Sequence, residues 1–177
     1  MSNVRQQLED WLRKIDVSGT VLDVGGAGRL VTDRTKSWQV SDYKVLDIQN
    51  DADYIRDINY PVNDVPQFGT IFCLEVMEYI WNPVQTLRNM RKWLKDDGLL
   101  YISFHFLFPH HSPKDKDYLR YTSKGIRKLM EETGFRILEI TPRMAKDLQH
   151  LKQWCDEESK VVNYGGEIGY LIKVKKK

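Results

Sequence analysis

The stretch VLDVGGAGRL, residues 21–30, decides the fold that this sequence predicts. An apolar run carries one acid, Asp23, and then breaks into three glycines among four residues, 25–28. Because glycine lacks a Cβ, the backbone N–H groups of such a corner can approach a ligand closely. In an open parallel sheet, ligands bind beyond the carboxyl ends of the strands, where the strand order reverses. We therefore predict a buried strand over residues 20–24 that ends at a cofactor site.

Strand-like and helix-like segments alternate along most of the chain. Apolar residues recur at helical spacing in four segments, and Asn82–Pro83 and either Thr122 or Ser123 are typical residues for a helix start. The predicted helices cover residues 4–15, 83–94, 123–133 and 144–157, and the predicted strands cover residues 20–24, 43–48, 53–58, 68–76, 99–104, 135–140 and 167–175. This alternation predicts an α/β fold, a three-layer α/β/α sandwich in a single domain over residues 1–177.

Two further acids follow predicted strands in the order that an adenosine would require. Asp47 ends the second strand, where a carboxylate can accept hydrogen bonds from both hydroxyls of a ribose. Asp57 comes after the third strand, where it can accept a hydrogen bond from the exocyclic amine of adenine. A single acid at a strand end is more often a turn residue, but the ordered series is more specific.

A dinucleotide site is the main alternative. Gly26, Gly28 and Val31 form the pattern G-x-G-x-x-V, and the spacing to Asp47 permits a nicotinamide cofactor. However, Val31 would hinder the close helix packing that a third glycine allows. Asp23 would repel a pyrophosphate, whereas it would attract a sulfonium or an amino group. An NAD(P)-dependent oxidoreductase is therefore the second hypothesis, and a non-catalytic cofactor-binding module is the third.

Five segments together resemble the class I S-adenosylmethionine-dependent methyltransferases of the small type-11 kind. They are VLDVGGAGR (21–29), VLDI (45–48), CLEVMEYIWNP (73–83), WLKDDGLLYIS (93–103) and HSPKDKDYLRYTSKGIRKLMEETGF (111–135). The last segment is similar to a subgroup often linked to polysaccharide or cell-envelope pathways. The resemblance implies a Rossmann-like, seven-stranded, mostly parallel sheet in the order 3-2-1-4-5-7-6. It also implies S-adenosyl-L-methionine as the cofactor.

The positions that match the cofactor-binding motifs of this family follow the first four predicted strands. They are Asp23, Gly25 and Gly26 for the methionine part, Asp47 and Ile48 for the ribose, Asp57 and Ile58 for the adenine, and Leu74 and Glu75 as a wall of the site. Ala27 and Tyr79 depart from the family pattern, which usually has a glycine and frequently a histidine at these positions.

The methyl acceptor is expected at the loop that follows the fifth strand. His105, His110, His111, Tyr118, Arg120 and Tyr121 gather there in the sequence. The catalytic residues predicted from the subgroup pattern are His111 as a general base, Arg120 as a ligand for an acidic or phosphorylated acceptor, and Tyr121. The alternative is that Arg120 pairs with Asp117 and that Tyr121 packs in the core. The predicted reaction transfers a methyl group to an oxygen or nitrogen of a small-molecule or sugar-type acceptor.

The overall composition indicates an ordinary globular chain. A net charge of +2 and a basic excess confined largely to residues 173–177 give no reason to expect a nucleic-acid partner. Two cysteines suggest no disulfide framework, and no metal site is predicted. With no signal peptide and no long apolar stretch in the sequence, a cytoplasmic protein without a membrane span is expected.

Overall fold

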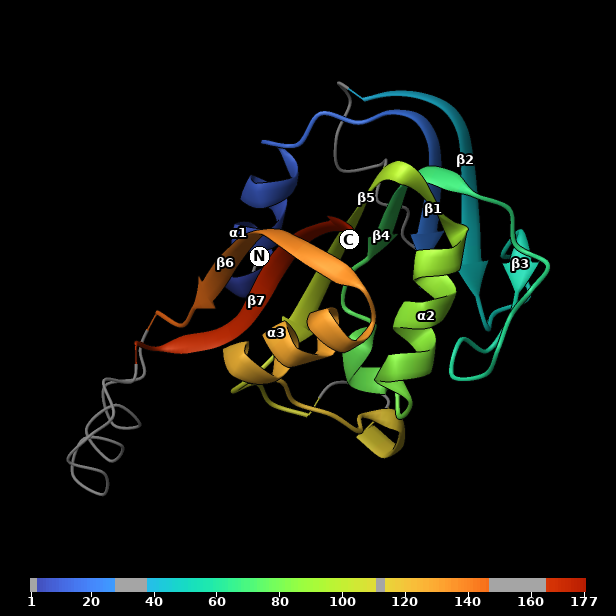
Figure 1. Ribbon diagram of the computed structural model, residues 1–177. Helices are drawn as coiled ribbons and strands as arrows, with labels where there is room; N and C mark the ends of the chain where they lie inside the picture. Colours follow the sequence, from blue (N-terminus) through green and yellow to red (C-terminus); the bar gives the residue numbers. More distant parts are fainter. Residues whose placement is uncertain (1–2, 28–37, 111–113, 147–164) are drawn as a thin grey trace.

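The computed structural model describes residues 3–27, 38–110, 114–146 and 165–177 (Figure 1). In these residues a seven-stranded sheet has the order β3-β2-β1-β4-β5-β7-β6, which confirms the predicted order. The strands are β1 (Ser18–Val24), β2 (Gln39–Asp47), β3 (Tyr54–Ile55), β4 (Phe68–Cys73), β5 (Leu94–His105), β6 (Phe135–Met144) and β7 (Glu167–Lys176). Neighbouring strands from β3 to β5 are parallel, whereas β7 runs antiparallel to both β5 and β6.

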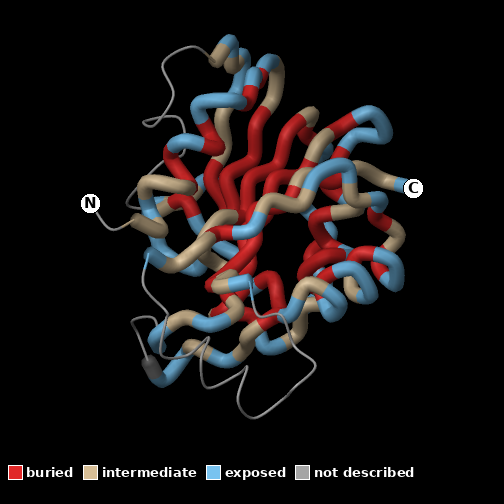
Figure 2. Tube along the Cα trace, turned by 90° about the vertical axis from the view of Figure 1, so that its left-hand side faces the viewer, coloured by how far each residue is buried: buried red, intermediate tan, exposed pale blue. Residues whose placement is uncertain are grey.

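In the described part of the chain, three α-helices cover the two faces of this sheet (Figure 1). They are α1 (Asn3–Leu12), α2 (Pro83–Trp93) and α3 (Ser123–Glu132). Because side chains alternate between the faces of a strand, β1 contributes Val21 to one core and Leu22 to the other. The core that contains Val21 is packed against α1, and the core that contains Leu22 is packed against α2 and α3. The buried segments run together through the middle of the molecule (Figure 2). The result is the predicted three-layer arrangement.

Both helix starts that the sequence indicates are confirmed. The Asn82 side chain accepts a hydrogen bond from the Gln85 N–H, and Pro83 occupies the first helical position. The Thr122 hydroxyl accepts a hydrogen bond from the Gly125 N–H at 3.1 Å. Each side chain thus satisfies a backbone donor that has no partner within its helix. Among the described helices, none is long and apolar enough to cross a membrane.

Every strand differs from its predicted boundaries by at least one residue; among the larger differences, β2 begins at Gln39, β4 ends at Cys73 and β6 extends to Met144. β3 is much shorter than residues 53–58, because Asp57 accepts a hydrogen bond from the Asn59 N–H at 3.0 Å and turns the chain away. β5 begins at Leu94 and not at residue 99. The chain passes directly from α2 into β5, with an irregularity in the pairing to β4 between Phe68 and Thr70.

The helix predicted over residues 144–157 is wrong at its first residue, because Met144 ends β6. Side chains of α1 hold Met144 extended: its N–H donates to Gln7 Oε1 at 2.7 Å, and its carbonyl accepts from the amides of Gln7 and Asn3. Leu148, Leu151 and Cys155, which carried the rest of that prediction, lie outside the described residues. α1 is also shorter than predicted and ends at Leu12.

Candidate cofactor and acceptor site

The glycine corner follows β1 at the carboxyl edge of the sheet. Gly25 has a φ of +77°, and its N–H donates to the Leu46 carbonyl at 2.8 Å. A Cβ at Gly25 would lie 2.3 Å from Val76 Cγ2. A Cβ at Gly26 would lie 2.5 Å from the carboxyl carbon of Asp23. The corner therefore requires glycine at both positions, because of backbone conformation and packing at Gly25 and of packing at Gly26.

Asp23 lies beneath this corner. Only 4% of it is exposed, and its Oδ2 accepts a hydrogen bond from the Tyr43 hydroxyl of β2. The buried carboxylate of Asp23 thus lies below the bare backbone of the corner, with the Tyr43 hydroxyl as a hydrogen-bond partner.

Asp47 links the end of β2 to the glycine corner. Its Oδ2 accepts from the Ala27 N–H at 3.2 Å, and its Oδ1 accepts from the N–H groups of Ile48 at 2.7 Å and Gln49 at 3.2 Å. A carboxylate has about four acceptor positions, so these three donors leave capacity for a hydroxyl of a ligand. Ile48 is 62% exposed beside it and offers an apolar surface at the same edge.

The two residues predicted to face the adenine have different environments. Asp57 is exposed, and its Oδ1 accepts from both the N–H and the side-chain amide of Asn59. Ile58 is 5% exposed and packs in the core, and its carbonyl accepts hydrogen bonds from Thr86 and Asn89 of α2. Asp57 is therefore accessible to a ligand, whereas the side chain of Ile58 supports this edge from below.

The carboxylates and the bare backbone of this edge fit an adenosine that carries a cationic tail. The corner at Gly25 and Gly26, where a Cβ has no room, would receive the cationic tail above Asp23. The accessible carboxylates of Asp47 and Asp57 match a ribose diol and an amine in the order that the sequence predicted.

The carboxylate of Glu75, predicted as a wall of the site, is held by side chains of other strands. Glu75 follows β4 with a φ of +60°, and it is the one non-glycine residue with positive φ in the described part of the chain. Its Oε1 accepts from Ser103 Oγ at 2.8 Å and from Arg143 at 2.6 Å. These contacts reach β5 and β6, and the neighbouring Leu74 packs against the core under α1.

The carboxylate of Glu75, whose side chain is 25% exposed, contacts a cluster of ionisable groups that includes the buried His105 and Glu78. His105 Nε2 lies 3.1 Å from Glu75 Oε2, and His105 Nδ1 lies 3.4 Å from Glu78 Oε1. Although burial opposes ionisation, His105 and Arg143 together hold the pKa of Glu75 well below its ordinary value. Glu75 is therefore ionised at neutral pH. Ser103 and Arg143 were missed by the sequence analysis, because no local pattern marks a residue whose partner is far away in the chain.

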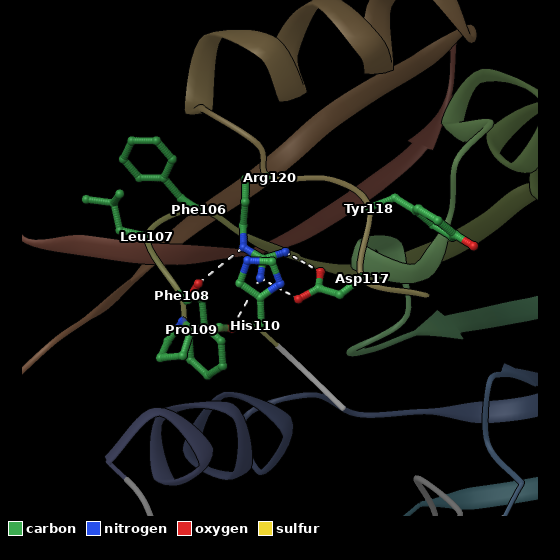
Figure 3. A pocket seen from close by; sticks show the side chains of 8 residues that line it. All are labelled: Phe106, Leu107, Phe108, Pro109, His110, Asp117, Tyr118 and Arg120. Carbon is green, nitrogen blue, oxygen red and sulfur yellow. Dashed lines mark hydrogen bonds and ion pairs between the residues drawn. The ribbon is translucent and has the colours of Figure 1, made fainter. Parts of the chain in front are cut away.

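A cleft of about 540 Å³ opens in the loop that follows β5 (Figure 3). Its lining residues are Phe106, Leu107, Phe108, Pro109, His110, Asp117, Tyr118 and Arg120. The volume lies in the usual range for a small-molecule site. The Phe108 ring stacks on the buried ring of His105 with centroids 4.3 Å apart, so the cleft adjoins the cluster around Glu75. This is the loop in which the sequence analysis expected the acceptor.

Arg120 uses all of its donors within the protein, and its pair with Asp117 is drawn in Figure 3. Nη1 and Nη2 form a two-pronged pair with the carboxylate of Asp117. The remaining N–H groups donate to the carbonyls of Phe108 at 3.3 Å, Pro109 at 3.2 Å and Leu119 at 2.9 Å. A guanidinium has five N–H donors, and five acceptors engage them here. The alternative considered from the sequence, a pair between Arg120 and Asp117, is thus present.

Tyr121 is buried and does not line the cleft. Its hydroxyl donates to the Met77 carbonyl at 3.0 Å, and its ring meets the edge of Phe104. Burial raises the pKa of its hydroxyl well above the ordinary value. The structure thus places Tyr121 in the core, the alternative considered from the sequence. His111 lies outside the described residues.

The fold and the acid-flanked glycine corner define a class I S-adenosylmethionine-dependent methyltransferase. Residues 2–140 match the family whose members share the methyltransferase domain, and the chain belongs to that family. It is an enzyme that uses S-adenosylmethionine, as the resemblance implied. The family match covers well over half of the chain and ends within β6.

Known proteins support the same class. A ubiquinone biosynthesis O-methyltransferase from Glaesserella parasuis serovar 5 (strain SH0165) is 40% identical over 42 residues, which are 24% of this chain and 18% of that protein. An S-adenosylmethionine-dependent methyltransferase from Mesorhizobium loti superimposes with a TM-score of 0.65 at 11% identity, over 98% of both chains. The N-methyltransferase NodS from Bradyrhizobium japonicum WM9 has a TM-score of 0.63 at 14% identity, over 98% of this chain and 96% of NodS. At these identities the structural likeness shows the fold.

Proposed function

We propose that the cofactor lies across the carboxyl ends of β1, β2 and β3. The glycine corner above Asp23 receives the methionine part, Asp47 and Ile48 hold the ribose, and Asp57 accepts from the adenine amine. The bare backbone at Gly25 and Gly26 and the remaining acceptor capacity of Asp47 support this arrangement. The family match supplies the identity of the cofactor.

The same proposal assigns the cleft after β5 to the methyl acceptor, a small-molecule or sugar-type compound methylated at oxygen or nitrogen. The observation that carries it is the position of the cleft. The loop is tied to the carboxyl ends of β4 and β5, because the Tyr118 N–H donates to the Glu78 carbonyl and the Tyr121 N–H donates to the His105 carbonyl, both at 2.8 Å. An acceptor in the cleft would therefore lie at the same edge of the sheet as the cofactor.

The side chains of the loop favour an uncharged acceptor. Arg120 would have to give up internal hydrogen bonds before it could bind a phosphate or carboxylate of the acceptor. We therefore assign Arg120 the task of holding the loop in shape, together with Asp117. The aromatic side chains of Phe106 and Phe108 would pack against the body of the acceptor, and Tyr118, which is 51% exposed, can offer its hydroxyl.

S-adenosylmethionine, when bound, supplies a methyl group that its sulfonium already activates. The protein then has to align the acceptor atom with that methyl group and exclude water. An amine acceptor needs no dedicated base, whereas a hydroxyl acceptor benefits from one. We propose His111 for this proton transfer, because its place in the loop matches the subgroup pattern.

This function is tested by comparing methyl transfer to different acceptors and by substituting histidines. The full chain is incubated with S-adenosylmethionine and matched acceptors: a phenol, a methyl glycoside, an aromatic amine and the phosphorylated form of each. We expect release of S-adenosylhomocysteine with an uncharged acceptor at least about 10-fold faster than with its phosphorylated form. For a hydroxyl acceptor, His111→Ala should slow transfer by about 10²–10⁴-fold. His150→Ala, a histidine outside the acceptor loop in the sequence, is the matched control and should retain most of the rate. Binding of S-adenosylhomocysteine without transfer to any acceptor would contradict the proposal.

A further inference from the structure

Arg143 is a buried arginine beyond the region that the family match covers. It lies near the end of β6, and only 1% of it is exposed. Nη1 donates to Glu75 Oε1 at 2.6 Å, and Nη2 donates to Glu75 Oε2 at 3.3 Å. A planar guanidinium that meets both oxygens of a carboxylate fixes its orientation as well as its charge.

A pairing irregularity brings Arg143 to this position. The register between β6 and β7 shifts between Arg143 and Met144. Such a bulge re-aims a side chain relative to a regular strand. α1 secures the same place, because Arg143 Nη2 also donates to the Val4 carbonyl at 3.1 Å and the Gln7 side chain binds the Met144 backbone. Two segments far apart in the sequence therefore meet behind Glu75.

The backbone of Glu75 needs this support. A non-glycine residue in the left-handed region is strained and persists where its surroundings hold it. The Glu75 N–H donates to Ser103 Oγ at 2.7 Å, and Arg143, Ser103 and His105 contact its carboxylate. Arg143 supplies two of these hydrogen bonds and the opposite charge. Its loss should therefore loosen the turn at Glu75 more than the loss of Ser103 or His105.

The turn at Glu75 shapes the glycine corner directly. Val76 follows Glu75, and its Cγ2 occupies the space that a Cβ at Gly25 would need. The corner and the turn are therefore packed without spare room. A change in the backbone of Glu75 would move Val76 and alter the surface on which the corner rests.

We propose that Arg143 is a positioning residue for S-adenosylmethionine. Held against Glu75, it fixes the turn after β4 in the shape that the glycine corner requires for cofactor binding. This inference rests on the proposed placement of the cofactor at the corner. Arg143 does not touch the cofactor and acts only through Glu75 and Val76.

Calorimetric titration with S-adenosylhomocysteine, together with thermal melting, tests this role. The variants are Arg143→Met, Arg143→Lys, Glu75→Gln and the double variant Arg143→Met/Glu75→Gln. Arg136→Met, an exposed arginine on the same strand, is the matched control. All affinities are measured well below the melting temperature of each variant.

Arg143→Met should weaken binding of S-adenosylhomocysteine at least 10-fold and lower the melting temperature. The double variant should regain most of the melting temperature, because no unpaired charge stays buried. Its affinity should stay at least fivefold weak, because the turn is still not anchored. Arg143→Lys should bind with intermediate affinity, and Arg136→Met should behave as the wild type. If Arg143→Met does not fold, the affinities of the double variant and of Arg143→Lys test the role of Arg143.

Two results would overturn the role of Arg143. Affinity could stay at the wild-type level in Arg143→Met, or it could return fully with stability in the double variant, as a merely structural residue would allow. The variant Asp47→Ala shows whether such a result means that the role of Arg143 is wrong or that the proposed placement of the cofactor is wrong. If Asp47→Ala also binds S-adenosylhomocysteine like the wild type, the proposed placement is wrong. If Asp47→Ala alone loses affinity, only the role of Arg143 is wrong.

Discussion

The carboxyl edge of the sheet has two halves that are built in different ways. Around β1 and β2, the proposed ligand-facing groups follow their strands directly, as the glycine corner and Asp47 do. Around β4 and β5, Glu75 is held by partners from other strands, Ser103 and Arg143. In the proposed arrangement, the first half offers backbone and carboxylate groups to a ligand, whereas the second half holds Glu75 with partners that maintain the shape of the turn. Groups that bind a ligand can therefore be found from local sequence, but groups that support them depend on long-range register.

The largest effect on cofactor affinity is expected from Gly25→Ala in the first half. The new Cβ would meet Val76 Cγ2 at 2.3 Å, and alanine would be strained at a φ of +77°. We expect about 100-fold weaker binding of S-adenosylhomocysteine, because strain of about 1–2 kcal/mol and overpacking of about 1–3 kcal/mol combine. Gly19→Ala is the matched control, with a φ of +78° and open space around its Cβ. If Gly25→Ala and Gly19→Ala lose the same affinity, the contact between Gly25 and Val76 does not explain the loss.

Asp47→Ala tests the first half alone. The variant removes the proposed acceptor of the ribose hydroxyls, and a hydrogen bond to a charged group contributes about 1.5–3 kcal/mol. We expect affinity for S-adenosylhomocysteine to fall by about 10–100-fold in calorimetric titration. Asp53→Ala serves as the control. Asp53 also accepts a backbone hydrogen bond from β2, at Val45, but it lies outside the proposed site. Similar losses in both variants would mean that Asp47 acts through the fold.

The pH dependence of stability tests the second half. Because its buried partners lower the pKa of Glu75 in the folded protein, the unfolded state binds a proton more readily below the ordinary value of 4.5. The contribution of Glu75 to stability is therefore present above pH 4.5 and is lost as the pH falls. Relative to Glu75→Gln, the wild type should lose up to about 1.4 kcal/mol per pH unit below pH 4.5. Urea unfolding from pH 7 to pH 3 measures this, and a constant difference between the two proteins would exclude the ionised cluster.

The smallest effect is expected from Tyr121→Phe. Removing the hydrogen bond to the Met77 carbonyl should lower the free energy of unfolding by about 1 kcal/mol. Affinity for S-adenosylhomocysteine and the rate of methyl transfer should not change. Tyr118→Phe, on the exposed side of the loop, should instead leave stability unchanged and raise the KM for the acceptor. A loss of transfer rate in Tyr121→Phe at unchanged stability would restore Tyr121 as a catalytic residue.

The sequence predicted the sheet order through the family resemblance, and the corner at Gly25 through its own residues. A strand that ends in an acid and glycines is a local feature, so no distant contact had to be known. The end of β6 was not predictable in this way. Met144 follows helical spacing in the sequence, but the side chain of Gln7 in α1 keeps it in a strand.

Arg120 and Tyr121 show the limit of residue type as evidence. An arginine and a tyrosine in a loop beside a proposed acceptor suggest catalysis, yet both also form good structural contacts. The pair of Arg120 with Asp117 needs only neighbouring residues, and the sequence analysis could consider it. The partner of Tyr121 is a backbone carbonyl at Met77, which carries no signal in the sequence.

The most direct test of the central claim is amide hydrogen exchange with and without S-adenosylhomocysteine. The claim is that the cofactor lies on the half formed by β1, β2 and β3. With S-adenosylhomocysteine bound, we predict slower amide exchange at residues 25–27, 48–49 and 57–59. The amides of the outer strand β6 should not be protected by contact with the ligand. Protection confined to the loop over residues 106–110, or no change in exchange at the glycine corner, would contradict the claim.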